Sequence, residues 1–282
     1  MLVVGSPIES TLGERLATVT LPDPTEDVYR LLKALYFRLY ATERPQNMEV
    51  LASLLRMATK YMVDNLRKEV IARLEILFPD TLEKYNSQDR KAVTPPDFDP
   101  IIAVELSLAC DVPAILPTAL YLSILRENAH SLSIGLSKAV QMGIFPPLQA
   151  HYRCLSFKDE FRTFTESAIT SAYNEPPWAC RYKDDRFACS TNKCYGIPVH
   201  SKRALELRLS GLHHDMFLDS TFLSLEKEGY AHLCPSCLEK IKAYQSAIRS
   251  KVWETGLPSA CGWRTWGDVK SGRPPTIKGA TA

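Results

Sequence analysis

Cysteine is the residue type whose spacing in this chain most clearly suggests chemistry. Cys234-Pro235-Ser236-Cys237 is a C-x-x-C turn, from which two thiolates can reach one tetrahedral metal ion. Cys189 and Cys194, with four residues between them, supply a second pair. The sequence therefore predicts a structural zinc site with the ligands Cys189, Cys194, Cys234 and Cys237, which would tie an irregular segment to the last helix.

Two alternatives to this zinc site stay open. The two cysteine pairs lie 39 residues apart, farther than in compact zinc ribbons, and other residues can substitute as ligands. These substitutes are Cys180, His200, His213, His214 and His232. The same cysteines can also be free thiols that pack as small hydrophobic residues. A redox role for the C-x-x-C turn would need a βαβ context, which the helical surroundings do not offer.

The other candidates for chemistry favour structural roles. Cys110 and Cys154 lie on apolar helical faces and are expected to be packing residues, and Cys261 is expected in a loop without a role. His213-His214-Asp215 has no accompanying G-x-S-x-G nucleophile motif, so we expect a surface loop there. Dinucleotide-binding glycine motifs, phosphate loops and H-E-x-x-H are absent from the sequence. We therefore expect a protein that is not an enzyme.

The C-terminal part is locally basic. Residues 238–282 contain eight basic and three acidic residues, with Trp253, Trp263 and Trp266 among them. The basic residues are Lys240, Lys242, Arg249, Lys251, Arg264, Lys270, Arg273 and Lys278. A zinc-dependent nucleic-acid surface is the alternative function that this composition allows. We prefer a solvated helix face, with the tryptophans anchoring the C-terminal segment on the helical body.

Composition and charge are typical of a globular protein and argue against several other classes of protein. The chain has 282 residues, 45% of them hydrophobic, and a formal net charge of +2. It is long enough for a substantial core and too weakly charged for nucleic acid to be an obligatory partner. No apolar run approaches the roughly 18 residues of a membrane span, and the N-terminus lacks the basic region of a signal peptide. We expect an intracellular protein, cytoplasmic or nuclear, without membrane partners.

The elements of the N-terminal part are one strand and three amphipathic helices. Ala17–Leu21 is rich in strand formers, and the chain before it supplies no obvious partner strand. Asp23, Pro24 and Glu26 predict a capped helix start with a capping box. The residues expected to face inward are Val28, Leu31, Leu32 and Leu35 in the first helix, Val50, Leu51, Leu54, Leu55 and Ala58 in the second, and Val63, Leu66, Val70, Leu74 and Leu77 in the third.

Further helices are expected after a polar linker that contains Thr94-Pro95-Pro96. Their inward residues are Ile101, Val104, Leu108 and Ala109, then Leu116, Ala119, Leu120 and Ile124, then a piece around 132–142, then Phe161, Phe164, Ile169 and Tyr173. Residues 174–237 look irregular, and 238–254 predict a final helix. From Thr265 onward the composition is typical of a frayed tail.

The order of these motifs resembles the BTB (POZ) domain-containing proteins of basidiomycete fungi. Leu21 to Tyr36 is similar to their strand-then-helix step, and Ala58-Thr59-Lys60-Tyr61-Met62-Val63 to the second half of the BTB domain. Asp97 to Tyr121 and the ending Leu233 to Pro258 look like the regions that follow the domain. The resemblance covers about residues 17–269. The first part of a BTB domain has no counterpart before Ala17, so the domain looks N-terminally truncated, which leaves dimerisation and cullin binding open.

The resemblance and the patterns together predict a mainly α-helical α+β protein, with a partial BTB/POZ fold followed by a helical domain and a Cys-rich irregular segment. The expected boundaries are 1–84 for the partial BTB domain, 85–99 for a linker, 100–173 for the helical domain, 174–237 for the Cys-rich segment, 238–269 for the C-terminal helix and Trp-rich end, and 270–282 for a flexible tail. What the resemblance implies is a non-enzymatic protein–protein interaction module, an adaptor or transcription-associated factor. Its expected partners are proteins, including self-association through the BTB part, and its only expected cofactor is structural zinc.

Overall fold

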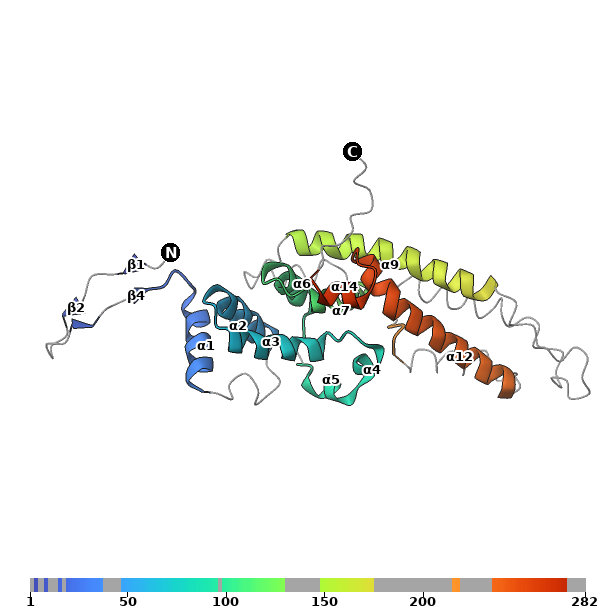
Figure 1. Cartoon of the computed structure of the whole chain (residues 1–282), viewed down its shortest axis with the longest axis horizontal. Coiled ribbons are helices and arrows are strands. Elements are labelled where there is room, and N and C mark those ends of the chain that lie inside the picture. The colour runs from blue at the N-terminus through green and yellow to red at the C-terminus, as the bar shows by residue number, and fades with distance from the viewer. Residues whose placement is uncertain are drawn as a thin grey trace, which may run out of the picture.

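The computed structural model describes most of the predicted helices. The described residues are 3–4, 8–9, 15–16, 19–37, 47–95, 98–129, 148–174, 215–218 and 235–272. This part of the chain is mainly α-helical, as predicted (Figure 1). The predicted helical piece around 132–142 lies outside it, as does most of the predicted Cys-rich segment.

The described elements follow one another in chain order. The strands are β1 (Val3–Val4), β2 (Ile8–Glu9), β3 (Arg15–Leu16) and β4 (Val19–Thr20). The helices are α1 (Thr25–Tyr36), α2 (Met48–Lys60), α3 (Asp64–Leu77), α4 (Leu82–Asn86), α5 (Gln88–Val93), α6 (Pro100–Ala109), the 3₁₀ turn η1 (Pro113–Ile115), α7 (Leu116–Ala129), α9 (Leu148–Asn174), α12 (Pro235–Lys251), the π-helical turn η4 (Val252–Gly256), α13 (Leu257–Ala260) and α14 (Trp266–Lys270).

The predicted strand does have a partner within the chain. Its described part, β4, pairs antiparallel with β1, so that Thr20 lies opposite Val3 and Val19 opposite Val4. A second pair joins β2 to β3. The labelled strands lie at the α1 end of the molecule (Figure 1). The expectation that the preceding residues supply no partner strand is wrong, because two-residue strands carry too little periodicity to be recognised.

The start of α1 differs from the predicted capping box. Pro24 occupies the N-cap position, and no side chain caps the helix. The Asp23 carboxylate instead accepts hydrogen bonds from Lys60 Nζ at 2.6 Å and from Tyr61 Oη at 2.5 Å, both at the end of α2. Glu26 pairs with Arg30 one turn later. The ammonium group of Lys60 offers a charge-assisted bond that a neutral helix amide cannot match, so Asp23 ties α1 to α2.

The predicted inward faces of α2 and α3 are confirmed. Leu51, Leu54, Leu55 and Ala58 are buried in α2, and Leu66, Val70, Leu74 and Leu77 in α3. Their spacing of three and four residues places each set on one face of its helix. In the next helices Val104, Leu116, Ala119, Leu120 and Ile124 are buried as predicted, whereas Ala109 is exposed at the end of α6. A terminal alanine has too little apolar surface to enforce burial.

Two short helices occupy much of the predicted linker. Ser87 separates α4 from α5 and caps α5 through its hydroxyl, which accepts from Arg90 N. Tyr85 of α4 is only 1% exposed. The buried apolar residues of the described segments, from Leu31 to Val269, form one cluster. The division into domains stays a prediction.

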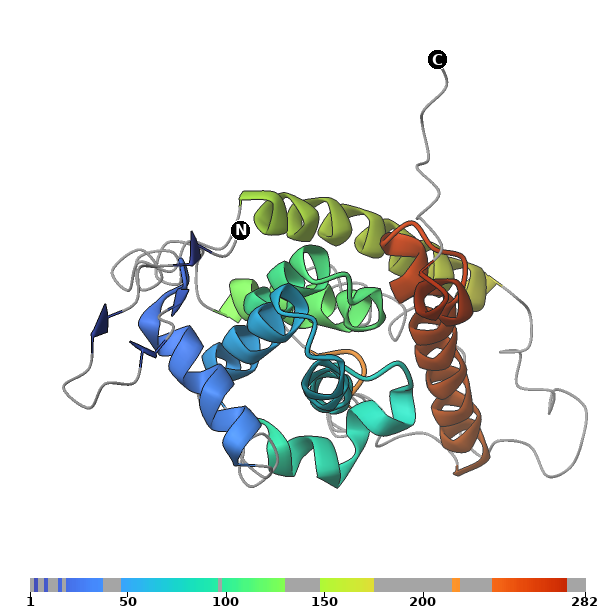
Figure 2. The same cartoon turned by 60° about the vertical axis from the view of Figure 1, so that its left-hand side comes forward.

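The last helix begins at Pro235, three residues before the predicted start, and continues beyond Lys251 through η4 into α13. Pro258 explains the π-helical turn, because proline has no N–H and its ring clashes with the carbonyl four residues earlier. The turn widens so that Leu257 N bonds to Val252 O. Both views place α9 alongside these C-terminal helices (Figures 1 and 2).

The predicted frayed tail from Thr265 is wrong as far as residue 272. Thr265 and Asp268 form a reciprocal capping box at the start of α14. Val269 of this helix is fully buried. A capping box satisfies two orphan amides at once, which stabilises even a five-residue helix. The rest of the predicted tail, 273–282, lies outside the described residues.

Candidate functional site

The predicted zinc ligands fall at the edge of the described chain. Cys189, Cys194 and Cys234 lie outside it, and Cys237 lies in the first turn of α12. Among the described residues, no group of three or more His, Cys, Asp or Glu side chains is arranged to hold a metal ion. The zinc site therefore stays a prediction.

The three described cysteines outside that set are buried, and none of them is in a disulfide. Cys110 is 4% exposed, Cys154 is fully buried and Cys261 is 7% exposed. Burial raises the pKa of the Cys110 and Cys261 thiols, which keeps them protonated and unreactive. The packing role predicted for Cys110 and Cys154 is confirmed. Cys261 has a packing role as well, in the turn after α13, which the sequence did not indicate.

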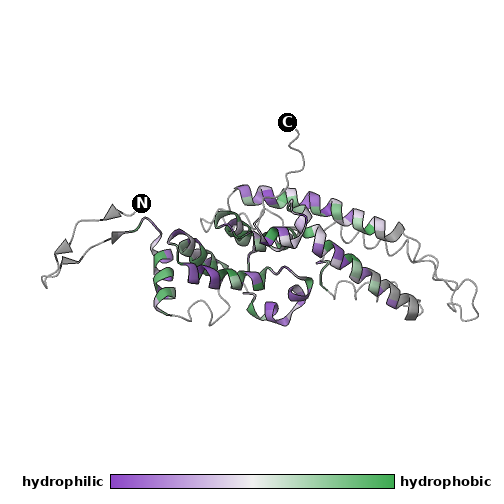
Figure 3. Cartoon of the chain, in the orientation of Figure 1, coloured by the Kyte–Doolittle hydropathy of each residue, from purple (hydrophilic) through white to green (hydrophobic). Residues whose placement is uncertain are grey.

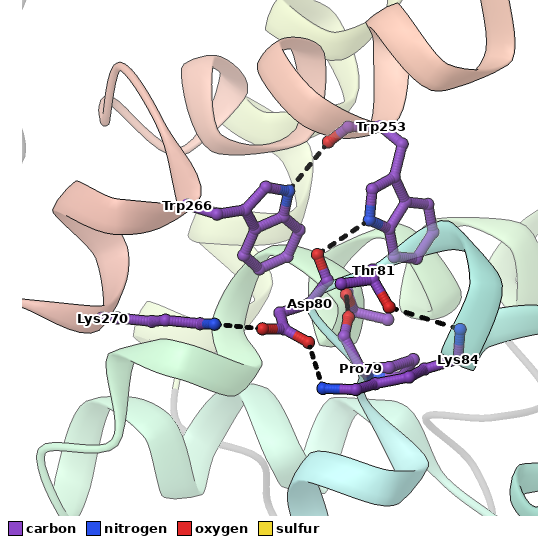
Figure 4. A network of polar contacts seen from close by, with 8 residues as sticks. Pro79, Asp80, Thr81, Lys84, Trp253, Trp266 and Lys270 are labelled. Atoms are coloured by element: carbon purple, nitrogen blue, oxygen red, sulfur yellow. Dashed lines mark hydrogen bonds and ion pairs between the residues drawn. The ribbon is translucent and has the colours of Figure 1, made fainter.

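A polar network joins the C-terminal helices to the junction of α3 and α4 (Figure 4). We call it the Asp80 latch. Trp253 Nε1 donates to the Asp80 carbonyl oxygen at 3.0 Å, and Trp266 Nε1 donates to the Trp253 carbonyl oxygen at 2.9 Å. The Asp80 carboxylate pairs with Lys84 at 3.0 Å and with Lys270. Trp253 is 1% exposed, so the predicted anchoring by tryptophan is confirmed.

Opposing influences act on the Asp80 carboxylate. Partial burial alone would raise its pKa, but the hydrogen bonds from Lys270 and Lys84 outweigh burial and hold the pKa below its usual range. Lys270 belongs to the basic C-terminal run for which a solvated face was expected. Its side chain is 55% exposed, but its ammonium group also forms an ion pair with Asp80 within the chain, so the latch is a structural site.

A second polar cluster surrounds Asp215. The sequence predicts a surface loop at His213-His214-Asp215, and the two histidines lie outside the described residues. Asp215 does lie in a loop, but its side chain is only partly exposed and bonds to two buried tyrosines. Its carboxylate accepts hydrogen bonds from Tyr85 Oη at 2.5 Å and from Tyr121 Oη at 2.8 Å. No periodic signal marks Asp215, because its partners lie 130 and 94 residues away in the chain.

The two tyrosines in this cluster resist ionisation. Tyr121 is fully buried and Tyr85 nearly so. Burial, followed by the negative charge of Asp215, raises the pKa of both phenols well above the ordinary tyrosine value. Both hydroxyls therefore keep their protons and remain donors at neutral pH. In the structure the two hydroxyls donate hydrogen bonds to the Asp215 carboxylate.

Several exposed large apolar side chains gather on α1 and the residue that follows it. We call this surface the α1 apolar face: Tyr29, Leu32, Leu35, Tyr36 and Phe37, with exposed fractions of 47% to 81%. Leu31, one turn before Leu35 on the same side of α1, is buried. Figure 3 draws α1 mostly in green, the colour of hydrophobic residues.

This face corrects the inward assignment of two residues. Leu32 and Leu35 are predicted to face the core but are about half exposed. Helix α1 packs mainly against α2, which covers the side that carries Leu31 and Val28. The predicted residues Val28, Leu31, Leu32 and Leu35 do share one side of α1, but α2 covers only part of that side. The structure thus leaves part of the apolar side of α1 exposed, which periodicity alone did not indicate.

Comparison with known proteins identifies no relative. No family model matches the chain, and neither a curated protein nor a solved structure matches it. No described helix is both long enough and apolar enough to span a membrane. The geometry of the described residues is therefore the basis for assigning a role.

Proposed function

We propose that this chain is a non-enzymatic protein–protein interaction module and that the α1 apolar face is its binding surface. The observation that carries the proposal is the outward exposure of five large apolar side chains on and next to one helix. Contiguous apolar surface in contact with water is unfavourable and marks interaction sites on soluble proteins. A partner that covers this face removes that surface from water.

The arrangement of the face suits a partner that packs along a helix. Tyr29, Leu32 and Tyr36 are spaced by three and four residues, so they form a stripe along α1. Tyrosine is enriched among the residues that dominate binding energy, because its ring is large and its hydroxyl can still bond to water or to the partner. Such a stripe fits an apolar groove or a second amphipathic helix.

The wider role that we propose follows the BTB resemblance. In this proposal the partial BTB part, which includes α1 to α3, supplies contacts to protein partners or to a second copy of the chain. The chain would then act as an adaptor or as a transcription-associated factor, in the cytoplasm or nucleus. The support is the order of sequence motifs together with the apolar face, and structural zinc would be its only cofactor.

A pair of matched variants tests the proposal. The variant Leu32→Glu/Tyr36→Glu places two charges on the α1 apolar face. The control variant Tyr152→Glu/Leu155→Glu places the same charges on exposed residues of the same types in α9. Both residue pairs are exposed, so both variants should retain the wild-type circular dichroism spectrum.

The measurement is quantitative affinity capture from cells, with light scattering of the purified chain as a test for self-association. We expect at least one captured protein, or the self-associated state, to be lost in the α1 variant and retained in the α9 control. Binding that is the same for wild type and both variants would contradict the role of the α1 apolar face.

A further inference from the structure

We infer that the helical body contains a binding socket for a short acidic–aromatic peptide of the form Asp-x-Phe, and that residues 215–218 of this chain fill it intramolecularly. The socket consists of Tyr85 and Asn86 of α4, Tyr121 of α7, Phe161 of α9 and Trp253 of η4. It lies apart from the α1 apolar face and does not depend on the function proposed for that face.

The first element of recognition is the Asp215 carboxylate. Tyr85 and Tyr121 donate to its two oxygens from different helices, at 2.5 Å and 2.8 Å. The turn also closes on itself, since Phe217 N donates to the same carboxylate at 3.0 Å. Each oxygen of the carboxylate thus has a donor from the socket, so an asparagine, which has one oxygen, would lose one of these bonds.

The second element is the main chain of the turn. Met216 N donates to Tyr121 Oη at 3.1 Å, and Asn86 Nδ2 donates to the Phe217 carbonyl oxygen at 3.0 Å. Tyr121 Oη therefore gives its proton to Asp215 and accepts one from Met216. Hydrogen bonds to the main chain of a peptide add affinity that does not depend on most of its side chains.

The third element is an aromatic pocket for Phe217, which is fully buried. Its ring lies 4.7 Å from Tyr121 and 4.8 Å from Trp253, measured between ring centroids and at steep angles. The rings of Tyr85 and Phe161 lie farther out, at 6.1 Å and 6.4 Å. Edge-to-face packing of this kind favours an aromatic residue over an aliphatic one of similar size.

The residues that line the socket also contact one another directly, independently of residues 215–218. The ring of Tyr85 lies 5.0 Å from that of Trp253, and the ring of Tyr121 lies 5.4 Å from that of Phe161. Trp253 is also held by its hydrogen bond to the Asp80 carbonyl oxygen. A socket whose walls are held by helices and by the Asp80 latch is largely preformed, which lowers the cost of binding a peptide.

The test uses a labelled synthetic peptide that spans residues 211–220 of this sequence. The protein is the full chain with Asp215→Ala/Phe217→Ala, which empties the socket. We expect saturable binding measured by fluorescence anisotropy, at least about tenfold tighter than to the wild-type chain, whose own turn competes at high effective concentration. The control peptide carries Asp215→Asn and Phe217→Ala and should bind at least about tenfold more weakly. Adding Asn86→Ala to the protein should weaken binding about fivefold.

A second form of the protein covers the case in which the emptied chain does not fold. Protease sites inserted near residues 200 and 226 allow the folded wild-type chain to be cut on both sides of the turn. We expect the labelled peptide to exchange into the cut protein and not into the uncut protein. A folded Asp215→Ala/Phe217→Ala chain that does not bind the peptide, or a cut protein that does not exchange it, would overturn the inference.

Discussion

The indole Nε1 of Trp253 donates a 3.0 Å hydrogen bond to the backbone carbonyl oxygen of Asp80, which lies 173 residues earlier in the chain. The bond closes the Asp80 latch from the C-terminal side, and Trp266 stacks on Trp253 with 6.1 Å between ring centroids. A partly buried carbonyl oxygen that loses its donor has limited access to water, so we expect a measurable cost when this bond is removed.

We expect Trp253→Phe to lower the free energy of unfolding by about 1–3 kcal/mol, because it removes the donor and leaves the Asp80 carbonyl unsatisfied. Urea denaturation measures the change. The matched control is Trp266→Phe, which removes a donor from a less buried ring and should cost less. Equal stability of Trp253→Phe and wild type would mean that water replaces the lost bond.

The Asp80 carboxylate should make stability depend on pH in the acidic range. Lys270 and Lys84 hold its folded pKa below the unfolded value of about 3.9, so the contribution to stability is complete above that value. It is lost as pH falls through the folded pKa. Asp80→Asn should therefore be less stable at neutral pH and should show a shallower loss of stability in acid, measured by urea denaturation at several pH values.

A control carboxylate is available in the exposed pair of Arg162 and Glu166 on α9, with 2.9 Å between Nε and Oε1. Exposed ion pairs contribute little to stability, so Glu166→Gln should leave the acid dependence close to that of wild type. If Asp80→Asn and Glu166→Gln change the acid dependence of stability equally, the Asp80 ion pairs stabilise the fold no more than an exposed surface pair does.

The tyrosines that bind Asp215 should produce the opposite pH dependence. Their folded pKa values are raised above the unfolded value of about 10, so their contribution is present below that pH and is lost as pH rises above it. We expect unfolding above pH of about 10, detected by circular dichroism together with tyrosinate absorbance. Tyr85→Phe/Tyr121→Phe should lessen this alkaline loss while lowering stability at neutral pH, since Asp215 loses both donors. An unchanged alkaline transition in the double variant would contradict the view that Tyr85 and Tyr121 cause the loss of stability at high pH.

Gly256 marks a close approach between the π-helical turn and α9. A Cβ atom at this position would lie 2.8 Å from two ring carbons of Phe164 and 3.2 Å from Val252 Cγ1. Gly256→Ala should therefore cost about 1–3 kcal/mol of unfolding free energy through overpacking. In Gly267→Ala the new Cβ would lie 3.5 Å from Thr265 Oγ1, an ordinary contact. That variant should be neutral or stabilising because alanine favours helix, and thermal denaturation of both variants checks the comparison.

The predicted zinc site can be measured directly. Cys237 lies in the first turn of α12. We expect about one zinc ion per chain by elemental analysis, lost after chelation and absent from Cys234→Ser/Cys237→Ser. The buried Cys154→Ser variant is the control and should retain the metal, since Cys154 lies outside the predicted ligand set. Purified wild-type chain without zinc would contradict the site.

The sequence was most informative where burial follows helical periodicity. Leu51, Leu54, Leu55 and Ala58 repeat at helical spacing, and their helix is enclosed by neighbours, so their predicted burial is confirmed. The same reasoning was wrong for Leu32 and Leu35. Periodicity shows which residues share a face, but it does not show whether another element covers that face.

The sequence by itself determined the helical character of the chain, the inward faces of α2 and α3 and the packing roles of Cys110 and Cys154, because these follow from local spacing and hydrophobicity. Only the tertiary structure decided that Asp23 bonds to Lys60 instead of capping α1, that Trp253 reaches Asp80, and that Asp215 lies between two tyrosines. These contacts join residues 37 to 173 positions apart. No local pattern encodes such pairs, since a carboxylate or indole can satisfy its hydrogen bonds with water, its own helix or a distant partner, and only packing selects among them.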